Sequence, residues 1–364
     1  MTPILIEEYG GRRRPATLVA RIATGSQGDV WTIDRADGLL AKVLYPSYRP
    51  SLAERLDVLA APPLAPAGNR DRRPARAAWP TGRAYDSADH SLVGFTMQHL
   101  ARPAYFPLDA LLLDDQRDAL LPGSTWSWSV SVAIELARAV DDLGGAGVVL
   151  GDLAPRNILV TSDARVTLLD VDGWQLGRPG ERLLPCPRSR PEYTAPELLD
   201  VPAGSVRAPS SDHWAVAVVV AQILLLGTHP FAGVRAGARP PYDEVANVRA
   251  GHCWLLGHEV TLRPRPPAID ALLTGEMKYL FDRALGEGRT RPHRRPTAAR
   301  WVDALEHGRR NLVRCTRNAR HVHLDTAPTC PWCELSDRGH ERYPAPERTR
   351  PAPQAERTHD RRAR

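Results

Sequence analysis

The chain has 364 residues, of which 25% are charged and 43% hydrophobic, with a formal net charge of +6. These values are ordinary for a globular protein with ample core. No stretch reaches the roughly 20 apolar residues of a membrane span, and the first residues lack the apolar region of a signal peptide. We therefore expect a cytoplasmic protein that does not enter a membrane.

From about Leu18 to Leu44 polar and apolar side chains alternate as in hairpin strands, and two further strands follow the next irregular stretch. A helix with leucines on one face is expected after the third strand, because Leu52, Leu56 and Leu59 recur at helical spacing. The predicted strands cover residues 18–22, 30–33, 39–44, 78–85 and 92–100.

After Pro107 the pattern becomes helical, apart from a Gly-, Pro- and Arg-rich irregular segment at residues 174–195. The predicted helices cover residues 108–120, 126–143, 211–226, 269–285 and 297–312. A small sheet-rich part followed by a large helical part predicts an α+β fold.

Two short motifs between these parts carry the chemistry. Asp152 lies five residues before Asn157 in Leu150-Gly-Asp-Leu-Ala-Pro-Arg-Asn-Ile-Leu-Val160, and Asp170 ends the next apolar run. Oxygen ligands and a proton acceptor at the ends of short strands suit Mg²⁺-dependent phosphoryl transfer, in which positioning and charge neutralisation supply most of the catalysis. The motifs therefore indicate a phosphotransferase.

From about Leu18 to Leu305 the chain resembles the protein kinase superfamily. The resemblance implies that Asp152 is the catalytic aspartate and that Asn157 and Asp170 bind Mg²⁺. It also implies a bilobal fold. The expected division is an N-terminal segment at 1–17, a kinase-like domain at 18–308 (N-lobe about 18–100, C-lobe about 101–308), a zinc-binding segment at 309–336 and a disordered basic tail at 337–364.

The resemblance also assigns an ATP site. Lys42, in Ala41-Lys-Val-Leu44, matches the strand lysine that binds the α- and β-phosphates, and its expected helix partner is Glu54, which can also be an ordinary surface acid. The segment from Gly25 to Val30 resembles the later part of a Gly-rich phosphate loop. The residues expected to line the nucleotide site are Gly25, Ser26, Gly28, Val30, Lys42, Glu54, Met97, Asn157 and Asp170.

Further downstream, three residues match structural supports of the family. Glu197, in Ala195-Pro-Glu197, is expected to pair with Arg295, because a buried carboxylate needs a cationic partner. Asp212 is expected to hold the catalytic loop through backbone hydrogen bonds.

Three departures from the family pattern stand near the catalytic residues. Leu150-Gly151 replaces the usual His-Arg, so we expect activity without phosphorylation of the activation segment. Ala154 replaces a lysine that helps to neutralise the phosphoryl group, and Arg156 or a residue from elsewhere is needed to compensate. Asp172 replaces a glycine; it either binds Mg²⁺ or fixes the turn.

A second site follows at the C-terminus. Cys315, His321, Cys330 and Cys333 offer four ligands with the spacing of a structural Zn²⁺ site, with His323 as the rival to His321. Disulfides are not expected for a cytoplasmic chain. The basic tail predicts a solvated terminus rather than a nucleic-acid contact.

The motifs also resemble a bacterial serine/threonine kinase subgroup whose neighbours include von Willebrand A proteins and metal-dependent phosphatases, and the resemblance implies these as partners. We expect an enzyme that uses ATP to phosphorylate a protein. Two alternatives remain at this point: a small-molecule phosphotransferase, and a pseudokinase scaffold that binds nucleotide without turnover.

Overall fold

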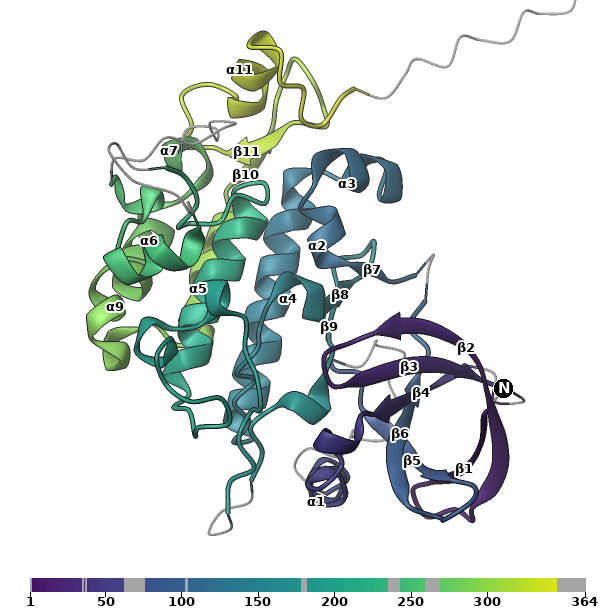
Figure 1. The fold of residues 1–364 in the computed structure, drawn as a ribbon. Helices are drawn as coiled ribbons and strands as arrows, with labels where there is room; N and C mark the ends of the chain where they lie inside the picture. Colours follow the sequence, from purple (N-terminus) through teal and green to yellow (C-terminus); the bar gives the residue numbers. More distant parts are fainter. Residues whose placement is uncertain are drawn as a thin grey trace, which may run out of the picture.

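The structure, a computed structural model, describes residues 2–34, 36, 38–61, 76–101, 104–177, 182–234, 243–258 and 269–345. Figure 1 shows a β-rich part, a larger helical part beside it, and a small C-terminal extension at the far end of the helices. Over the described residues, no helix has both the length and the apolar character needed to cross a bilayer.

Six antiparallel strands close into a barrel in the order β1-β2-β3-β4-β6-β5. The strands are β1 (Thr2–Glu8), β2 (Arg14–Thr24), β3 (Gly28–Ile33), β4 (Leu39–Leu44), β5 (Pro80–Asp86) and β6 (Leu92–Gln98). Apolar side chains such as Ile4, Ile6 and Leu18 fill the inside of the barrel. Closure leaves no free sheet edge, which removes a common route to aggregation.

The prediction of a separate segment at residues 1–17 is wrong. Ile4 pairs with Ala16 of β2 and with Asp86 of β5, so the first strand joins the two sides of the barrel. One of its two partners, β5, lies about eighty positions away in the sequence, where local patterning carries no signal.

Helix α1 (Leu52–Leu59) forms where the leucine spacing predicts it. Its buried face carries Leu52 and Leu56, which pack with Leu44 and Phe95 of the barrel. The helix therefore lies against β5 and β6, next to the strand that carries Lys42.

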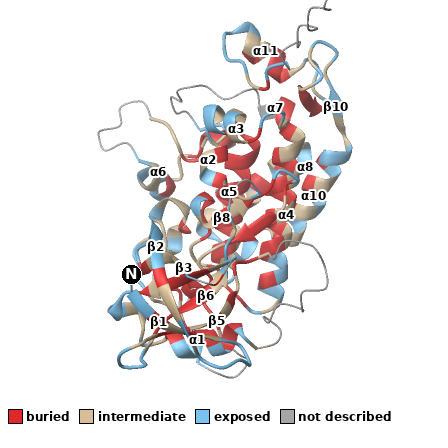
Figure 2. Cartoon of the chain, turned by 90° about the vertical axis from the view of Figure 1, so that its right-hand side faces the viewer, coloured by how far each residue is buried: buried red, intermediate tan, exposed pale blue. Residues whose placement is uncertain are grey.

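The helical part is organised around α4 (Trp126–Gly145) and α5 (Ser210–Leu224), which pack against each other. Helix α5 is buried nearly all round, as expected for the centre of a bundle. Figure 2 shows the buried residues gathered along these helices and β8, with exposed residues on the outer helices. The other helices are α2 (Leu108–Leu111), α3 (Asp114–Leu120), α6 (Glu244–Ala250), α7 (Ile269–Leu272), α8 (Gly275–Phe281), α9 (Gly288–Thr290) and α10 (Ala298–Arg310).

Two helices expected to be continuous are broken. The predicted helix 108–120 divides at Leu113, which is extended. The predicted helix 269–285 divides before Thr274, whose hydroxyl accepts the Met277 N–H at 3.2 Å and caps α8. Apolar periodicity runs through both breaks, and only the second carries a capping side chain, Thr274.

The C-terminal extension consists of the hairpin β10 (Leu312–Arg314) and β11 (Val322–Leu324), followed by α11 (Pro331–Asp337). The prediction that the tail begins at residue 337 is wrong, because Tyr343 is fully buried and its ring lies 5.0 Å from that of Trp332. Trp332 in turn contacts Trp126 at the start of α4. Residues 346–364 lie outside the described part.

Candidate active site and metal centre

A short hairpin brings the motif residues together. Strands β8 (Ile158–Val160) and β9 (Val166–Leu168) pair antiparallel, with Ile158 opposite Leu168. Asn157 therefore lies beside the end of β9, and its carbonyl accepts the Leu169 N–H at 2.8 Å. The hairpin also pairs with β7 (Phe106–Pro107) on its other side. Asp170, which follows Leu169, has a left-handed backbone (φ 63°), a conformation that is costly for residues other than glycine and typical of functional sites.

Asp152 is joined to Asn157 and to the segment that follows the hairpin. The Asn157 amide donates to the Asp152 carbonyl at 2.9 Å and to Oδ2 at 3.2 Å. Arg190 donates its backbone N–H to Oδ1 at 3.0 Å and its Nη1 to Oδ2 at 2.7 Å. Burial raises the pKa of Asp152, and the Arg190 charge opposes that shift.

The catalytic loop is held by Asp212 as the sequence predicts. Its two carboxylate oxygens accept the N–H groups of Leu150 at 2.6 Å and Gly151 at 2.9 Å. Gly151 has φ 71° and is closely packed against Cys186, so a side chain at this position would collide. Burial raises the pKa of Asp212 to about 6, although both hydrogen bonds favour its charged form.

Lys42 lies in the middle of β4, where Val30 and Phe95 are its neighbours on adjacent strands. Its ammonium group pairs with Asp170 and with Asp172, the latter at 2.7 Å. Burial alone lowers the pKa of a lysine, but the two carboxylates outweigh it and raise the pKa of Lys42. The side chain therefore stays charged inside the protein.

The predicted pairing of Lys42 with Glu54 is wrong for this structure. Glu54 is exposed on α1, whereas the neighbouring Arg55 is buried. Arg55 donates to the carbonyls of Trp174 at 2.7 Å and Pro185 at 2.6 Å. The buried charged residue of α1 is therefore Arg55, which binds the segment after Asp170, and not the expected Glu54.

The predicted phosphate loop is a tight turn between β2 and β3. The Gly25 N–H donates to the Gly28 carbonyl at 2.9 Å, and Ser26 between them is exposed. A Cβ on Gly28 would lie 2.2 Å from the Val43 carbonyl oxygen, so only glycine fits. The turn lies beside the end of the strand that carries Lys42, because the Gln27 carbonyl accepts the Tyr45 N–H at 2.8 Å.

A narrow pocket joins the turn to the catalytic residues. It is lined by Gln27, Leu150, Asp152, Asn157, Asp170, Gly173, Trp174 and Arg188. Sequence reasoning missed Gln27, Trp174 and Arg188, because nothing in their local pattern separates them from ordinary loop residues. Met97, expected at the nucleotide, lies on β6 and packs against the cluster around Leu44 and Phe95.

The ion pair expected between Glu197 and Arg295 is present in the structure. Both Glu197 oxygens accept from Arg295, at 2.7 Å each, and the Arg295 side chain is fully buried. Arg295 also donates to the carbonyls of Ser210 and Gly288 at 2.9 Å and lies over the Trp214 ring. A bidentate pair of this kind fixes geometry as well as charge.

Arg207 is a further residue that sequence reasoning missed. It donates Nη1 to the Gly151 carbonyl at 2.6 Å and Nη2 to the Ser189 hydroxyl at 3.1 Å. Its backbone is held by Gln175, whose amide makes hydrogen bonds of 2.7 and 2.9 Å to the Arg207 N–H and carbonyl. Arg207 therefore links the catalytic loop to the segment before Glu197.

The donor set at the hairpin fits a hard cation. The side-chain hydrogen bonds of Asn157 to Asp152 come from its amide nitrogen and do not use its Oδ1. The side chain of Asp170 is 34% exposed. Carbonyl and carboxylate oxygens of this kind are the usual protein ligands of Mg²⁺.

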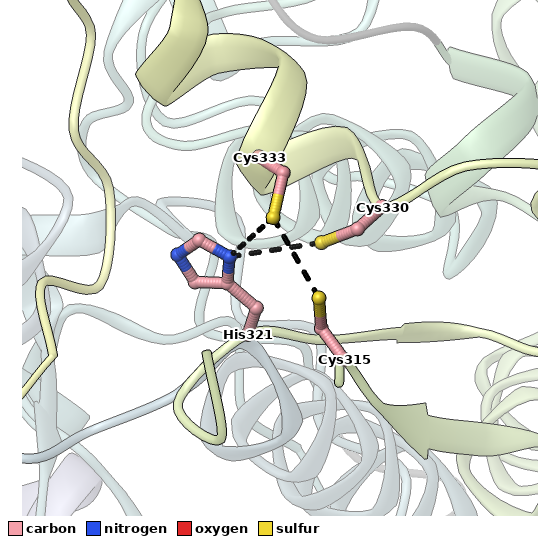
Figure 3. Close-up of side chains that lie close together, drawn as sticks. All are labelled: Cys315, His321, Cys330 and Cys333. Carbon is pink, nitrogen blue, oxygen red and sulfur yellow. Dashed lines mark hydrogen bonds between the residues drawn. The ribbon is translucent and has the colours of Figure 1, made fainter. Parts of the chain in front are cut away.

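The four C-terminal ligand residues converge, with one ligand atom from each within 4.8 Å of the others. Figure 3 shows the four side chains pointing toward one another. The Cys333 Sγ lies 3.6 Å from the Cys315 Sγ and 3.4 Å from the His321 Nδ1, which is 3.7 Å from the Cys330 Sγ. Four ligands at Zn–S and Zn–N distances of about 2.3 and 2.1 Å stand about 3.6–3.8 Å apart around a tetrahedral ion. The cluster therefore has the size of a zinc site.

His321, not its rival His323, belongs to this cluster. The Nδ1 of His323 lies 2.8 Å from the Leu324 carbonyl, outside the group. The other nitrogen of His321, Nε2, lies 3.0 Å from the Asn318 amide and 3.5 Å from the Glu341 carboxylate. Outer contacts of this kind orient a metal-binding histidine.

Comparison with known proteins agrees with the motifs. Residues 108–244 match the family model of protein tyrosine and serine/threonine kinases, a span that includes Asp152, Asn157, Asp170, Glu197 and Asp212. The chain is 28% identical over 326 residues to protein kinase YegI of Escherichia coli, an alignment that covers 87% of this chain and 48% of that protein. The chain thus spans about half the length of this relative.

A shorter similarity reaches eukaryotic proteins. Serine/threonine-protein kinase SBK2 of Mus musculus is 33% identical over 153 residues, which cover 39% of this chain and 40% of that protein. Serine/threonine-protein kinase GRIK2 of Arabidopsis thaliana is 31% identical over 100 residues, 28% of this chain and 24% of that protein. Each of these similar proteins is named as a protein kinase.

Proposed function

We propose that this chain is an ATP- and Mg²⁺-dependent protein kinase that transfers the γ-phosphoryl group of ATP to a serine or threonine hydroxyl. One observation carries the proposal: Lys42 pairs with Asp170, the preceding Leu169 is hydrogen-bonded to Asn157, and Asn157 donates to Asp152. The barrel then acts as the N-lobe and the helical part as the C-lobe, with ATP bound between them.

Asp152 orients the substrate hydroxyl and accepts its proton while the new oxygen–phosphorus bond forms and the bond to the ADP oxygen breaks. Lys42 binds the α- and β-phosphates, and the turn from Gly25 to Gly28 covers them. Mg²⁺, when bound, would be held by Asn157 and Asp170 and would neutralise phosphate charge.

Arg190 compensates for the missing lysine at Ala154. Its guanidinium contacts Asp152, whereas Arg156 is exposed and points to solvent. A fixed cation beside the catalytic carboxylate is suited to neutralise the transferred phosphoryl group.

The activation segment needs no phosphate in this proposal. Gly151 stands where the phosphate-binding arginine is expected, and Arg207 instead bridges the Gly151 carbonyl to Ser189. The segment is thus tied to the catalytic loop by a residue that is always charged.

The C-terminal cluster holds a structural Zn²⁺ ion through Cys315, His321, Cys330 and Cys333. Three thiolates and a histidine fill a tetrahedral shell and leave no position for a substrate. We further propose that the chain acts in the cytoplasm of a bacterium, beside the von Willebrand A and phosphatase partners that the resemblance implies.

Purified chain with labelled ATP and Mg²⁺ tests the proposal, with self-phosphorylation and transfer to a generic protein as readouts. Asp152→Asn should lower transfer by about 10²–10⁴-fold, and the exposed Asp115→Asn, a matched control, should not.

Three results would contradict the protein kinase. Nucleotide binding without any transfer would leave the pseudokinase scaffold. Transfer to small metabolites alone would leave the small-molecule phosphotransferase. Equal activity of the two asparagine variants would remove Asp152 from the mechanism.

A further inference from the structure

We infer that Asp172, from the turn after the metal-binding aspartate, is the positioning residue that holds Lys42, in place of a carboxylate on helix α1. This inference rests on the proposed function, because it concerns how the ATP-binding lysine is kept in place. It also removes the need for an acid on α1 as the partner of the lysine.

The first argument is electrostatic. Lys42 is 6% exposed, and an ammonium group at that depth requires a permanent counter-charge. It has two carboxylate partners, Asp170 and Asp172. Asp170 stands at the mouth of the site with 34% of its side chain exposed, whereas the Asp172 side chain is 1% exposed. Only Asp172 is enclosed with the lysine.

The two carboxylates then have separate tasks. When Asp170 turns to a metal ion, Lys42 keeps a partner, so the exchange leaves no buried charge alone. Without Asp172 the lysine would compete with the metal for Asp170. We therefore assign Asp172 the task of releasing Asp170 for the cation.

The second argument is that α1 offers no acid on its buried face. Its two carboxylates, Glu54 and Asp57, are both exposed, and Asp57 pairs with Arg83 on the outside of the barrel. The inward polar residue is Arg55, a cation, which donates to the Trp174 carbonyl just beyond Asp172. The Arg55 charge also acts on Asp172.

Asp172 is held in place by its own turn. Val171–Gly173 forms one turn of 3₁₀ helix, and the Gly173 N–H donates to the Asp170 carbonyl at 2.8 Å. Lys42 is the partner of Oδ1, while Oδ2 is buried without a hydrogen bond from the described residues. A buried carboxylate with one open oxygen is tolerated here because Lys42 and Arg55 supply positive charge from two sides.

The decisive measurement is the affinity for ADP with Mg²⁺, determined by calorimetry on the full chain. Asp172→Asn keeps the shape and removes the charge, and it should weaken binding about tenfold or more. Glu54→Gln is the matched control and should change binding less than twofold. Thermal unfolding of each variant verifies that it is folded.

A double-mutant cycle separates positioning from a general structural role. In a Lys42→Met background, Asp172→Asn should have little further effect on nucleotide affinity, because the residue acts through Lys42. Equal weakening in both backgrounds, or a tenfold loss in Glu54→Gln, would overturn the inference. Failure of the proposed kinase activity is a different result: the wild-type chain would transfer no phosphate while the affinity difference persisted.

Discussion

The catalytic loop and the C-terminal cluster both gather polar side chains, but different forces hold them. The catalytic loop is fixed by the protein itself, through Asp212 and Arg207, whose bonds to Leu150 and Gly151 come from residues far along the chain. The cluster around Cys333 joins the hairpin β10–β11 to α11 through its four ligands, beside the ring contacts of Trp332 with Trp126 and Tyr343. Loss of Zn²⁺ should therefore loosen the C-terminal region and leave the catalytic loop in place.

The largest loss of stability is expected from removal of the Arg295–Glu197 ion pair. Arg295→Met removes the bidentate partner of Glu197 and the donor to the Ser210 and Gly288 carbonyls. It should lower the free energy of unfolding by about 3–4 kcal/mol, because each buried polar group left unsatisfied costs about 1–3 kcal/mol. Urea denaturation measures the loss. Arg300→Met, in an exposed side chain of α10, serves as the control, and equal loss in both variants would contradict the assignment.

Removal of zinc should come next. If free Zn²⁺ exceeds its dissociation constant a hundredfold, a chelator should cost about 3 kcal/mol of stability. Hydrogen exchange should locate the loosening at residues 312–337, with the catalytic loop still protected. Cys330→Ser should behave like the chelated wild type and respond to the chelator no further. Loss of protection at Leu150 would show that the two regions are coupled.

A smaller effect distinguishes Arg190 from Arg156 as the residue that takes the role of the lysine replaced by Ala154. Arg190→Ala should lower the transfer rate on the order of 100-fold, because it removes a charge that contacts Asp152. Arg156→Ala should stay within about threefold. The transfer rate at saturating ATP is the readout, and the reverse order of the two variants would assign the role to Arg156.

The mildest change is a pH effect on the loop's support. Because the pKa of Asp212 is raised to about 6 from an ordinary 3.8, the folded protein takes up a proton here as the pH falls through 6. The stability linked to this group is greatest below pH 3.8 and is lost as the pH rises through 6. Activity should move the other way, since the protonated carboxyl accepts the two loop N–H groups less well.

Measurement of kcat/KM from pH 5 to 8, together with denaturation at the same pH values, checks this opposition. We expect the rate to fall to about half near pH 6 while the contribution of Asp212 to stability grows. A rate that stays flat down to pH 5 would show that the carboxylate remains charged.

The sequence by itself determined the parts that depend on short spacing. The strands around Lys42, the loop from Asp152 to Asn157 and the cysteine pair at Cys330 and Cys333 are each defined within a few residues. Backbone geometry fixes such neighbours, so residue type and spacing are enough to predict them.

Tertiary structure decided the partnerships. That Lys42 pairs with Asp172 and not Glu54, and that Arg190 reaches Asp152, depends on residues separated by tens to more than a hundred positions. A cation and an acid on the surface of a helix have the same local pattern as a buried pair. Only the packing of α1 against the barrel decides which of them is taken out of water, and burial sets the strength of each charge.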